Sequence, residues 1–319
     1  MNLGFLKLDR ASAYHKKSYT PLQSRAVGAY LGLAVGDALG ATVEFLVPRE
    51  IQERYGVQRD IQGGGWLNLK PGQVTDDTEM SLALGQSLID NDGLVTEAVA
   101  ESFSDWMRSK PVDIGNTVRR GIVNYRTTGK TTVPENDYDA GNGACMRSLP
   151  IAIAYHKAEL DVLAQASRAQ SHITHNNQQA DAGTETLLRM LGAAMAGVSK
   201  QSLKGMAQEL VEQHTAFRFD RRLVENPSGW IVETLQAVFQ SFFAHDDFET
   251  ILVDVVNRGG DADTTGAIAG MLAGAYYGVE FIPLHWLNAL DRKVACDCEV
   301  QALALLHLAE RSPEPLVIT

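Results

Sequence analysis

Cysteine is scarce in this sequence, and its few copies exclude several kinds of site. The 319 residues contain three cysteines, Cys145, Cys296 and Cys298. A single residue separates the last two, a spacing that suits neither a zinc ribbon nor a thioredoxin-type motif. The first twenty residues also lack the hydrophobic core of a secretory signal. An odd cysteine count without such a signal predicts a reducing, cytoplasmic setting.

Excess positive charge and long apolar runs are missing as well. The formal net charge is −11, and no basic stripe is present to neutralise the phosphates of a nucleic acid. Uninterrupted apolar stretches fall short of the about 18 residues that indicate a membrane-spanning helix. We therefore expect no nucleic-acid partner and no membrane span.

Alternating strand patterns and low-complexity linkers are equally scarce, so the sequence predicts one all-α domain despite its length. The domain is expected over residues 21–319, after a basic, polar arm at residues 1–20. That arm is either a frayed terminus or a segment that docks on an acidic partner. Apolar periodicity predicts helices from Ser24 onward and over 80–89, 97–109, 115–125, 144–156, 160–171, 180–198, 202–214, 231–243 and 248–257, with a last pair over 286–308.

Glycine, by contrast, recurs regularly in two distant places, at every fourth residue over 28–40 and again over 266–278. Each glycine costs a helix about 1 kcal/mol relative to alanine, so close backbone approach along one ridge should compensate. A membrane pair of this Gly-x-x-x-Gly type is excluded by length and by Asp37 within the first run. The pattern predicts two packed core helices that bring Asp37, Glu44 and the segment 261–264 together.

Two oxygen-rich clusters lie far apart in the chain, Thr75-Asp76-Asp77-Thr78-Glu79 and Asp261-Ala262-Asp263-Thr264. Like-charged carboxylates repel each other, and hard divalent cations such as Mg or Mn bind carboxylate and hydroxyl oxygens. Either cluster alone is more typical of a helix N-cap with an acidic first turn. Together they favour a metal site that is assembled by folding, with a pair of metals as an open alternative.

Seven segments carry a further signal because of their order along residues 24–308. They are Gly36–Glu44, Gly63–Trp66, Thr75–Met80, Pro111–Thr117, Gly141–Arg147, Ile173–Asn176 and Gly260–Gly266. As a set they resemble the ADP-ribosylglycohydrolase family. Within it, the chain is most similar to the dinitrogenase reductase-activating glycohydrolases, which remove ADP-ribose from an arginine.

The resemblance implies an orthogonal helical bundle with a binuclear Mn or Mg centre. The metal ligands it implies are Thr75, Asp76, Asp77, Asp261, Asp263 and Thr264. Glu44 would lie beside the metals, and Asp113 would face the arginine end of the substrate. The positions it implies along the ADP-ribose cleft are Gly115, Asn116, Gly141, Asn142, Gly143, Arg147, His175 and Trp230.

The implied site suits the hydrolysis of ADP-ribosylarginine, with Glu44, Asp113 and Asp77 as candidate catalytic residues. Paired metals can bind the ribose diol and activate a water molecule or a hydroxyl. Glu44 or Asp113 can serve as general acid–base, and Asp113 can also hold the planar guanidinium through paired hydrogen bonds. The loop 141–143 before a helix can offer backbone N–H groups to the pyrophosphate without any basic side chain.

Some of these residues keep a second interpretation. Arg147 can instead neutralise the acidic interior, and His175 can have a hydrogen-bonded structural role.

Two positions depart from the family pattern. Asn177-Gln178 stands where close relatives often continue with His-Pro, and Trp230 replaces a tyrosine, which preserves stacking but loses the phenolic hydrogen bond.

The sequence therefore predicts a metal-dependent ADP-ribosylarginine hydrolase that reverses mono-ADP-ribosylation of a partner protein, with dinitrogenase reductase activation as one possible role. An alternative is an immunity protein that neutralises an ADP-ribosyltransferase toxin by hydrolysis and by blocking with residues 1–20. A non-catalytic, crystallin-like binder ranks last, because it predicts a damaged ligand set and this set is complete.

Overall fold

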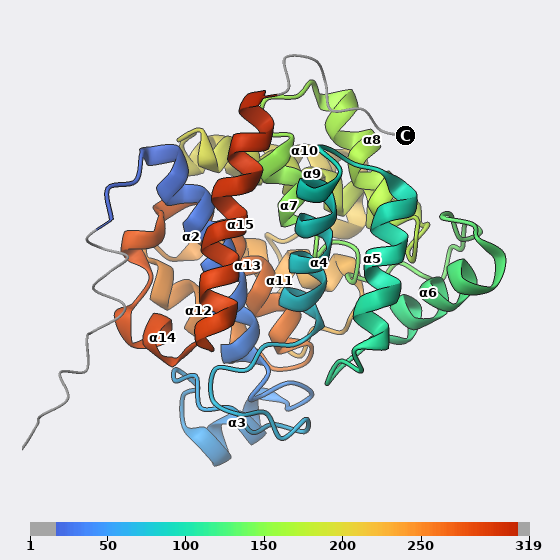
Figure 1. Ribbon diagram of the computed structural model, residues 1–319. Helices are drawn as coiled ribbons and strands as arrows, with labels where there is room; N and C mark the ends of the chain where they lie inside the picture. The colour runs from blue at the N-terminus through green and yellow to red at the C-terminus, as the bar shows by residue number, and fades with distance from the viewer. Residues whose placement is uncertain (1–16, 312–319) are drawn as a thin grey trace, which may run out of the picture.

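The computed structural model describes residues 17–311, which fold entirely through helices, turns and loops (Figure 1). The predicted all-α class is confirmed. The fourteen α-helices of this range are α2 (Pro21–Gly40), α3 (Pro48–Tyr55), α4 (Asp76–Asp90), α5 (Thr96–Arg108), α6 (Asn116–Thr128), α7 (Leu149–Ala154), α8 (Leu160–Ser171), α9 (Gln178–Met195), α10 (Lys200–Gln213), α11 (Ile231–Ala244), α12 (Phe248–Val256), α13 (Ala262–Tyr277), α14 (Leu284–Ala289) and α15 (Arg292–Arg311). Two short 3-10 helices, η1 (Thr215–Phe217) and η2 (Val279–Phe281), complete the set.

Helices α2 and α13 form the centre of the molecule and run antiparallel with their backbones in contact. A Cβ atom added at Gly36 would lie 1.9 Å from the carbonyl oxygen of Gly266, and one at Gly32 would lie 2.2 Å from that of Gly270. No larger side chain fits at these positions without forcing the helices apart. The predicted packing of the two glycine-rich helices is therefore present, and nearly every residue of both is buried.

Other helices enclose this central pair. Helix α15 crosses in front of α2 in Figure 1, with α4 and α5 beside it, while α11 and α12 pack against α13. Tyr30 of α2 links three of these elements, because its hydroxyl donates to the Gln301 side chain of α15 and lies 3.1 Å from the carbonyl of Ser81 on α4. The core is thus continuous from the central pair to the outer helices.

The antiparallel arrangement places the end of α2 beside the start of α13. A Cβ atom on Gly40 would lie 2.1 Å from the carbonyl oxygen of Ala262. Glu44 follows α2 within a single turn, and Asp261 occupies the N-cap of α13. The segment 41–75, which includes α3, covers this end at the bottom of Figure 1. Both oxygen-rich clusters therefore meet here.

The observed helices differ from the predicted ones in two places. Helix α3 was not predicted, since seven of its eight residues remain partly or fully exposed and its sequence is strongly polar. The helix predicted over 144–156 begins only at Leu149, because residues 143–147 form turns in which the N–H groups of Cys145 and Met146 both donate to the carbonyl of Asn142.

Residues 1–16 of the predicted arm lie outside the described residues. The described segment just before α2 is anchored on α15, where the ammonium of Lys17 and the hydroxyl of Tyr19 both donate to Glu299. Within residues 17–311, no helix has the length and apolar character needed to cross a membrane.

Candidate functional site

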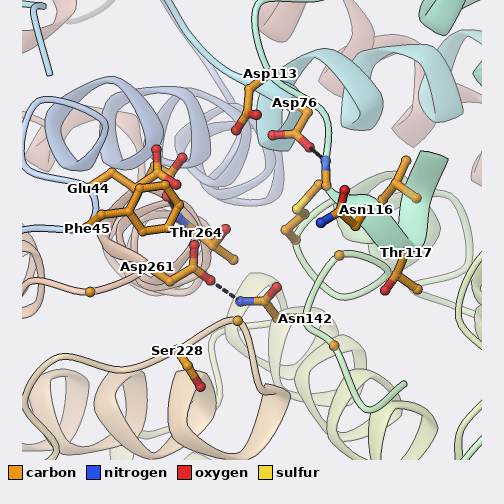
Figure 2. A pocket seen from close by; sticks show the side chains of 18 of the residues that line it. Glu44, Phe45, Asp76, Asp113, Asn116, Thr117, Asn142, Ser228, Asp261 and Thr264 are labelled. Carbon is orange, nitrogen blue, oxygen red and sulfur yellow. Dashed lines mark hydrogen bonds between the residues drawn. The ribbon is translucent and has the colours of Figure 1, made fainter. Parts of the chain in front are cut away.

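A cavity of about 670 Å³ opens at the end of the α2–α13 pair (Figure 2). Its walls come from the segment after α2, from the N-terminal ends of α4, α6 and α13, and from the loops 141–146 and 226–229. The predicted site residues that line it are Glu44, Asp76, Asp113, Gly115, Asn116, Gly141, Asn142, Gly143, His175, Asp261, Asp263 and Thr264. Thr75 and Asp77 are also buried in this region, without lining the cavity themselves.

The first cluster is fixed by Asp37, a buried carboxylate of α2 that was not among the predicted site residues. Its oxygens accept from the N–H and hydroxyl groups of Thr75 at 3.0 to 3.1 Å, and from the corresponding groups of Thr78. Thr75 occupies the N-cap of α4, but its side chain makes no cap hydrogen bond. Because Asp37 satisfies the orphan amide groups instead, Asp76 and Asp77 are free for other partners.

Asp77 joins the two clusters. Its Oδ2 lies 3.3 Å from the hydroxyl of Thr75 and 3.3 Å from the hydroxyl of Thr264, which belongs to α13. Its Oδ1 is buried without a hydrogen-bond partner among the described residues. A buried carboxylate oxygen without a donor is costly, and a bound cation would satisfy it.

Three further carboxylates converge where α2 ends and α13 begins. Glu44, Asp261 and Asp263 can each place one oxygen so that all three atoms lie within 4.8 Å of one another. Asp263 accepts from the N–H of its neighbour Thr264 at 2.9 Å, whereas Asp261 at the N-cap makes no cap hydrogen bond. Figure 2 shows Glu44 and Asp261 facing each other across one end of the cavity, with Asp76 and Asp113 opposite.

The electrostatics of this group favour a bound cation. Burial raises the pKa of Glu44 and of Asp76 to about 8, and repulsion by neighbouring carboxylates adds to both shifts. Burial likewise raises the pKa of Asp77 and of Asp263 well above the ordinary value. A divalent ion would restore the ionised forms, and oxygen ligands alone suit Mg or Mn rather than Zn. The residues present therefore fit a hard divalent metal.

Asp261 is positioned by two loops that meet at the start of α13. Its N–H donates to the carbonyl of Pro227 at 2.8 Å, and its Oδ2 accepts from the Asn142 side-chain amide at 2.5 Å. The same amide also donates to the hydroxyl of Thr234, 2.9 Å away. Asn142 thus connects the predicted ligand-binding loop directly to a predicted metal ligand. The loop 226–229 was not predicted, since nothing in its sequence indicates which segment it touches.

Glu44 is held by a tryptophan at the mouth of the cavity. The indole Nε1 of Trp66 donates to Glu44 Oε2 at 2.6 Å, which opposes the effect of burial on the carboxyl pKa. Three successive glycines with φ of 71°, 84° and 66° form the turn that delivers Trp66. The side chain of Phe45, itself at φ 62°, packs beside the indole with 5.4 Å between ring centroids. Both rings line the cavity and are more than half exposed.

The opposite wall is the start of α6. Asp113 Oδ1 accepts from the N–H of Ile114 at 2.7 Å, and Asp76 Oδ2 accepts from the N–H of Gly115 at 3.3 Å. Helix α6 then begins at Asn116, and its first residues line the cavity. A helix N-terminus directs unpaired N–H groups and the positive end of the helix dipole at its ligand. This end of the cavity is therefore suited to an anion.

The loop 141–143 does not itself open a helix, contrary to the prediction. Turns follow it, and the next helix, α7, begins only at Leu149. The N–H of Asn142 is used by the carbonyl of Gly229, while those of Gly143 and Ala144 have no backbone acceptor among the described residues. The loop can still offer amide groups, but the helix N-terminus on this side of the cavity is that of α6.

Arg147 and Trp230 are not part of the cavity wall within the described chain. Arg147 is fully buried, because its guanidinium bonds to Gln170 and Thr174 and stacks 4.4 Å from the ring centroid of Phe103. The predicted contact of Arg147 with the cleft is corrected accordingly. Trp230 is 40% exposed, and its indole donates to Gln179 at 3.2 Å, so stacking on a ligand stays a prediction for this residue.

Comparison with known proteins identifies the chain and its fold with one family. The model of ADP-ribosylglycohydrolases matches residues 18–315. The chain belongs to the ADP-ribosylglycohydrolase family. Its similarity extends to a solved structure titled "ADP-ribosylglycohydrolase-related protein complex", with a TM-score of 0.80 and 36% identity, over 90% of this chain and 99% of that one.

Two relatives in the same family show how far the similarity reaches. The ADP-ribosyl-[dinitrogen reductase] glycohydrolase of Rhodospirillum rubrum is 51% identical over 292 residues, which cover 90% of this chain and 97% of the relative. The ADP-ribosylarginine hydrolase Tri1 of Pseudomonas putida is 32% identical over 313 residues, covering 92% of this chain and 81% of the relative. The predicted family is confirmed.

Proposed function

We propose that this protein is an ADP-ribosylarginine hydrolase that uses divalent cations to release ADP-ribose from a modified arginine of another protein. One observation carries the proposal. The two acidic clusters meet in a single cavity that the N-terminus of α6 also lines, so cation-binding carboxylates and anion-binding N–H groups share one site. The functions named for both relatives agree with this arrangement.

The chain can hold the cations through the oxygens gathered around Asp77. We assign two ions, Mn or Mg, to the set Thr75, Asp76, Asp77, Asp261, Asp263 and Thr264, with Glu44 beside them. Bound there, such ions would supply Lewis-acid chemistry to the ribose hydroxyls and a water molecule.

The remaining steps fall to the chain's own groups. Glu44 has one oxygen fixed by Trp66 and the other left to take or give a proton. Asp113 lies near Glu44 and Asp76 and can hold the guanidinium through paired hydrogen bonds. The first turn of α6 and the N–H group of Gly143 can hold the pyrophosphate. On this proposal, the scissile bond would lie between Asp113 and the metal ligands.

The direct test uses arginine-ADP-ribosylated peptide, chelator-treated enzyme and added Mn or Mg. Mass spectrometry should show loss of the ADP-ribose mass only when a cation is restored. Hydrolysis that persists in chelator would contradict the metal dependence. No hydrolysis with either cation would contradict the proposed substrate.

Toxin neutralisation by the N-terminal arm stays a prediction, since residues 1–16 lie outside the described residues. The segment that joins this arm to α2 is anchored at Glu299, at the far end of α2 from Glu44. The twenty residues of α2 separate these ends by about 30 Å. We therefore favour hydrolysis as the activity of the cavity.

We further propose that the protein acts in the cytoplasm, where its three cysteines would stay free.

A further inference from the structure

Arg147 is a buried cation whose contacts lead toward the cavity. Its Nε donates to the Gln170 side chain at 2.9 Å, and one terminal nitrogen donates to the carbonyl of Gln170 at 3.0 Å and to the hydroxyl of Thr174 at 2.8 Å. The Thr174 hydroxyl in turn lies 2.8 Å from Nδ1 of His175. A continuous path of hydrogen bonds thus joins a fully buried guanidinium to a histidine of the cavity wall.

The donors and acceptors along this path determine which nitrogen of His175 carries the hydrogen. A guanidinium has donors only, so the Thr174 oxygen must accept from Arg147. If His175 Nδ1 carried a proton, the oxygen would accept a second time, and the buried hydroxyl hydrogen would have no acceptor among the described contacts. Leaving a buried polar group unpaired is costly. The favoured arrangement has the Thr174 hydroxyl donating to Nδ1, which puts the ring hydrogen on Nε2.

The Nε2 end of the ring reaches the cavity between two glycines. A Cβ atom added at Gly141 would lie 3.1 Å from Nε2, and one at Gly143 would lie 3.1 Å from Nε2 and 2.9 Å from Cε1. Any side chain at either position would crowd the nitrogen and cover it. The Gly-Asn-Gly sequence therefore does more than form a turn, because its glycines keep one ring edge accessible.

His175 is neutral in this position. Burial, with additional repulsion from Arg147 and Arg120, lowers the pKa of His175 to about 3. The ring is therefore a single N–H donor at any working pH. It lies on the same side of the cavity as the first turn of α6, since Val118 contacts the same Gly143 position. The ring N–H and the first turn of α6 therefore lie close together in the cavity wall.

We propose that Arg147, acting through Thr174, holds His175 in its Nε2–H tautomer so that it donates a hydrogen bond between Gly141 and Gly143 to a phosphate oxygen of bound ADP-ribose. Arg147 and Thr174 are positioning residues in this account, and His175 is the binding residue. The nature of the ligand rests on the proposed function, whereas the tautomer is a property of the protein alone.

The tautomer is tested by nitrogen NMR on protein labelled with ¹⁵N-histidine, with the spectrum of His175→Gln used to assign the resonance. The wild-type ring should show a protonated Nε2 and an unprotonated Nδ1. Thr174→Val keeps the shape of the side chain but removes the donor, and should produce a mixture of tautomers. Thr174→Ser should restore the wild-type pattern. A wild-type Nδ1–H tautomer would overturn the proposal regardless of any activity.

Binding is tested with ADP-ribose by calorimetry and with ADP-ribosylarginine by steady-state kinetics. Thr174→Val should weaken ADP-ribose binding and raise KM about tenfold, the size of one net hydrogen bond, with a smaller change in kcat. Thr174→Ser should match the wild type. Gln at position 175 retains a donor near Nε2 and should bind better than His175→Leu.

Ser171→Ala is the matched control, because the hydroxyl it removes accepts from Gln170 in the same buried network. Ser171 contacts His175 through its backbone carbonyl, which the substitution keeps. It should keep the wild-type tautomer and KM. If Ser171→Ala and Thr174→Val raise KM equally, or if Thr174→Val leaves KM unchanged, the path has only a packing role. Failure of the wild type to hydrolyse ADP-ribosylarginine would instead count against the proposed function, and would leave the NMR result standing.

Discussion

The α2–α13 pair has two regions that differ in charge and packing: the length along which the two helices touch, and the end that carries the carboxylates. Along most of their length the helices are neutral and apolar, and glycine lets their backbones touch at Gly32 and Gly36. At the end where Glu44 and Asp263 meet, the same pair supports a group of carboxylates that repel each other. The packed part stabilises the fold, whereas the charged end destabilises it without a cation. This difference shows how an unfavourable site can be tolerated when a well-packed scaffold supports it.

The largest expected effect is the loss of activity when a carboxylate at the charged end of the α2–α13 pair is replaced. Asp263→Asn should lower kcat/KM about 10³-fold, because weaker metal binding removes several kcal/mol of transition-state stabilisation. The metal-free variant should nevertheless be at least as stable as the metal-free wild type, because one repelling charge is gone. Kinetics and thermal unfolding in chelator measure both. Asp105→Asn, on the exposed face of α5, is the control and should leave activity unchanged. Activity near wild type in Asp263→Asn would contradict the assigned ligand set.

A substitution in the packed part of the α2–α13 pair should change stability rather than activity. Gly36→Ala should reduce the free energy of unfolding by about 3 kcal/mol, because its Cβ would overlap the carbonyl of Gly266. Gly192→Ala on α9 is the matched control, since nothing lies within 4 Å of its added Cβ. That change should stabilise the protein by about 1 kcal/mol through helix propensity. Equal denaturation midpoints for the two variants would show that the helices can separate freely.

Manganese should stabilise the protein by about 2.7 kcal/mol at a hundredfold excess over Kd. At a fixed manganese concentration, this gain in the free energy of unfolding should grow with pH, because the ligands lose their protons and Kd falls. The raised pKa values of Glu44 and Asp76 contribute stability below the unfolded value near 4, and this contribution is lost as pH rises toward 8. The metal-free protein should therefore weaken between pH 5 and pH 8, while the loaded protein should not. Calorimetry in two buffers should also detect protons released on binding. A metal-induced gain that falls with pH would refute this account.

The smallest expected effect is a fall in kcat when Trp66 at the mouth of the cavity is replaced. Trp66→Phe keeps an aromatic ring beside Phe45 but removes the hydrogen bond to Glu44, so kcat should fall about tenfold. Trp106→Phe is the matched control, because its indole also donates to a glutamate, Glu79, at 2.8 Å, away from the cavity. It should change stability rather than kcat. Similar kcat values for the two variants would mean that Trp66 does not orient Glu44.

The sequence predicted the helical class and the meeting of the two clusters for a physical reason. Glycine at every fourth residue has few explanations in a soluble helix other than backbone contact, and such contact fixes which helix ends lie together. The short polar helix α3 gave no apolar period to detect. The turn over 143–147 was mistaken for a helix because its residues are buried by distant parts of the chain.

The side-chain details depended on contacts that no local pattern encodes. Arg147 is turned away from the cleft by partners from α8 and the segment after it. Asp37 was expected near the site, but its place beneath the start of α4 becomes clear only from five hydrogen bonds to Thr75 and Thr78. The assigned metal ligands and cleft residues stay predictions until the variants above are measured.

The contact between Gly36 and Gly266 also limits how substrate can enter. Two helices whose main chains already touch have no side chains between them to rearrange, so a scissor-like hinge at this joint would break the fold's tightest packing. We expect the entrance to widen and narrow through the flexing of its flanking loops, around Trp66 on one side and Ser228 on the other, while the floor stays still.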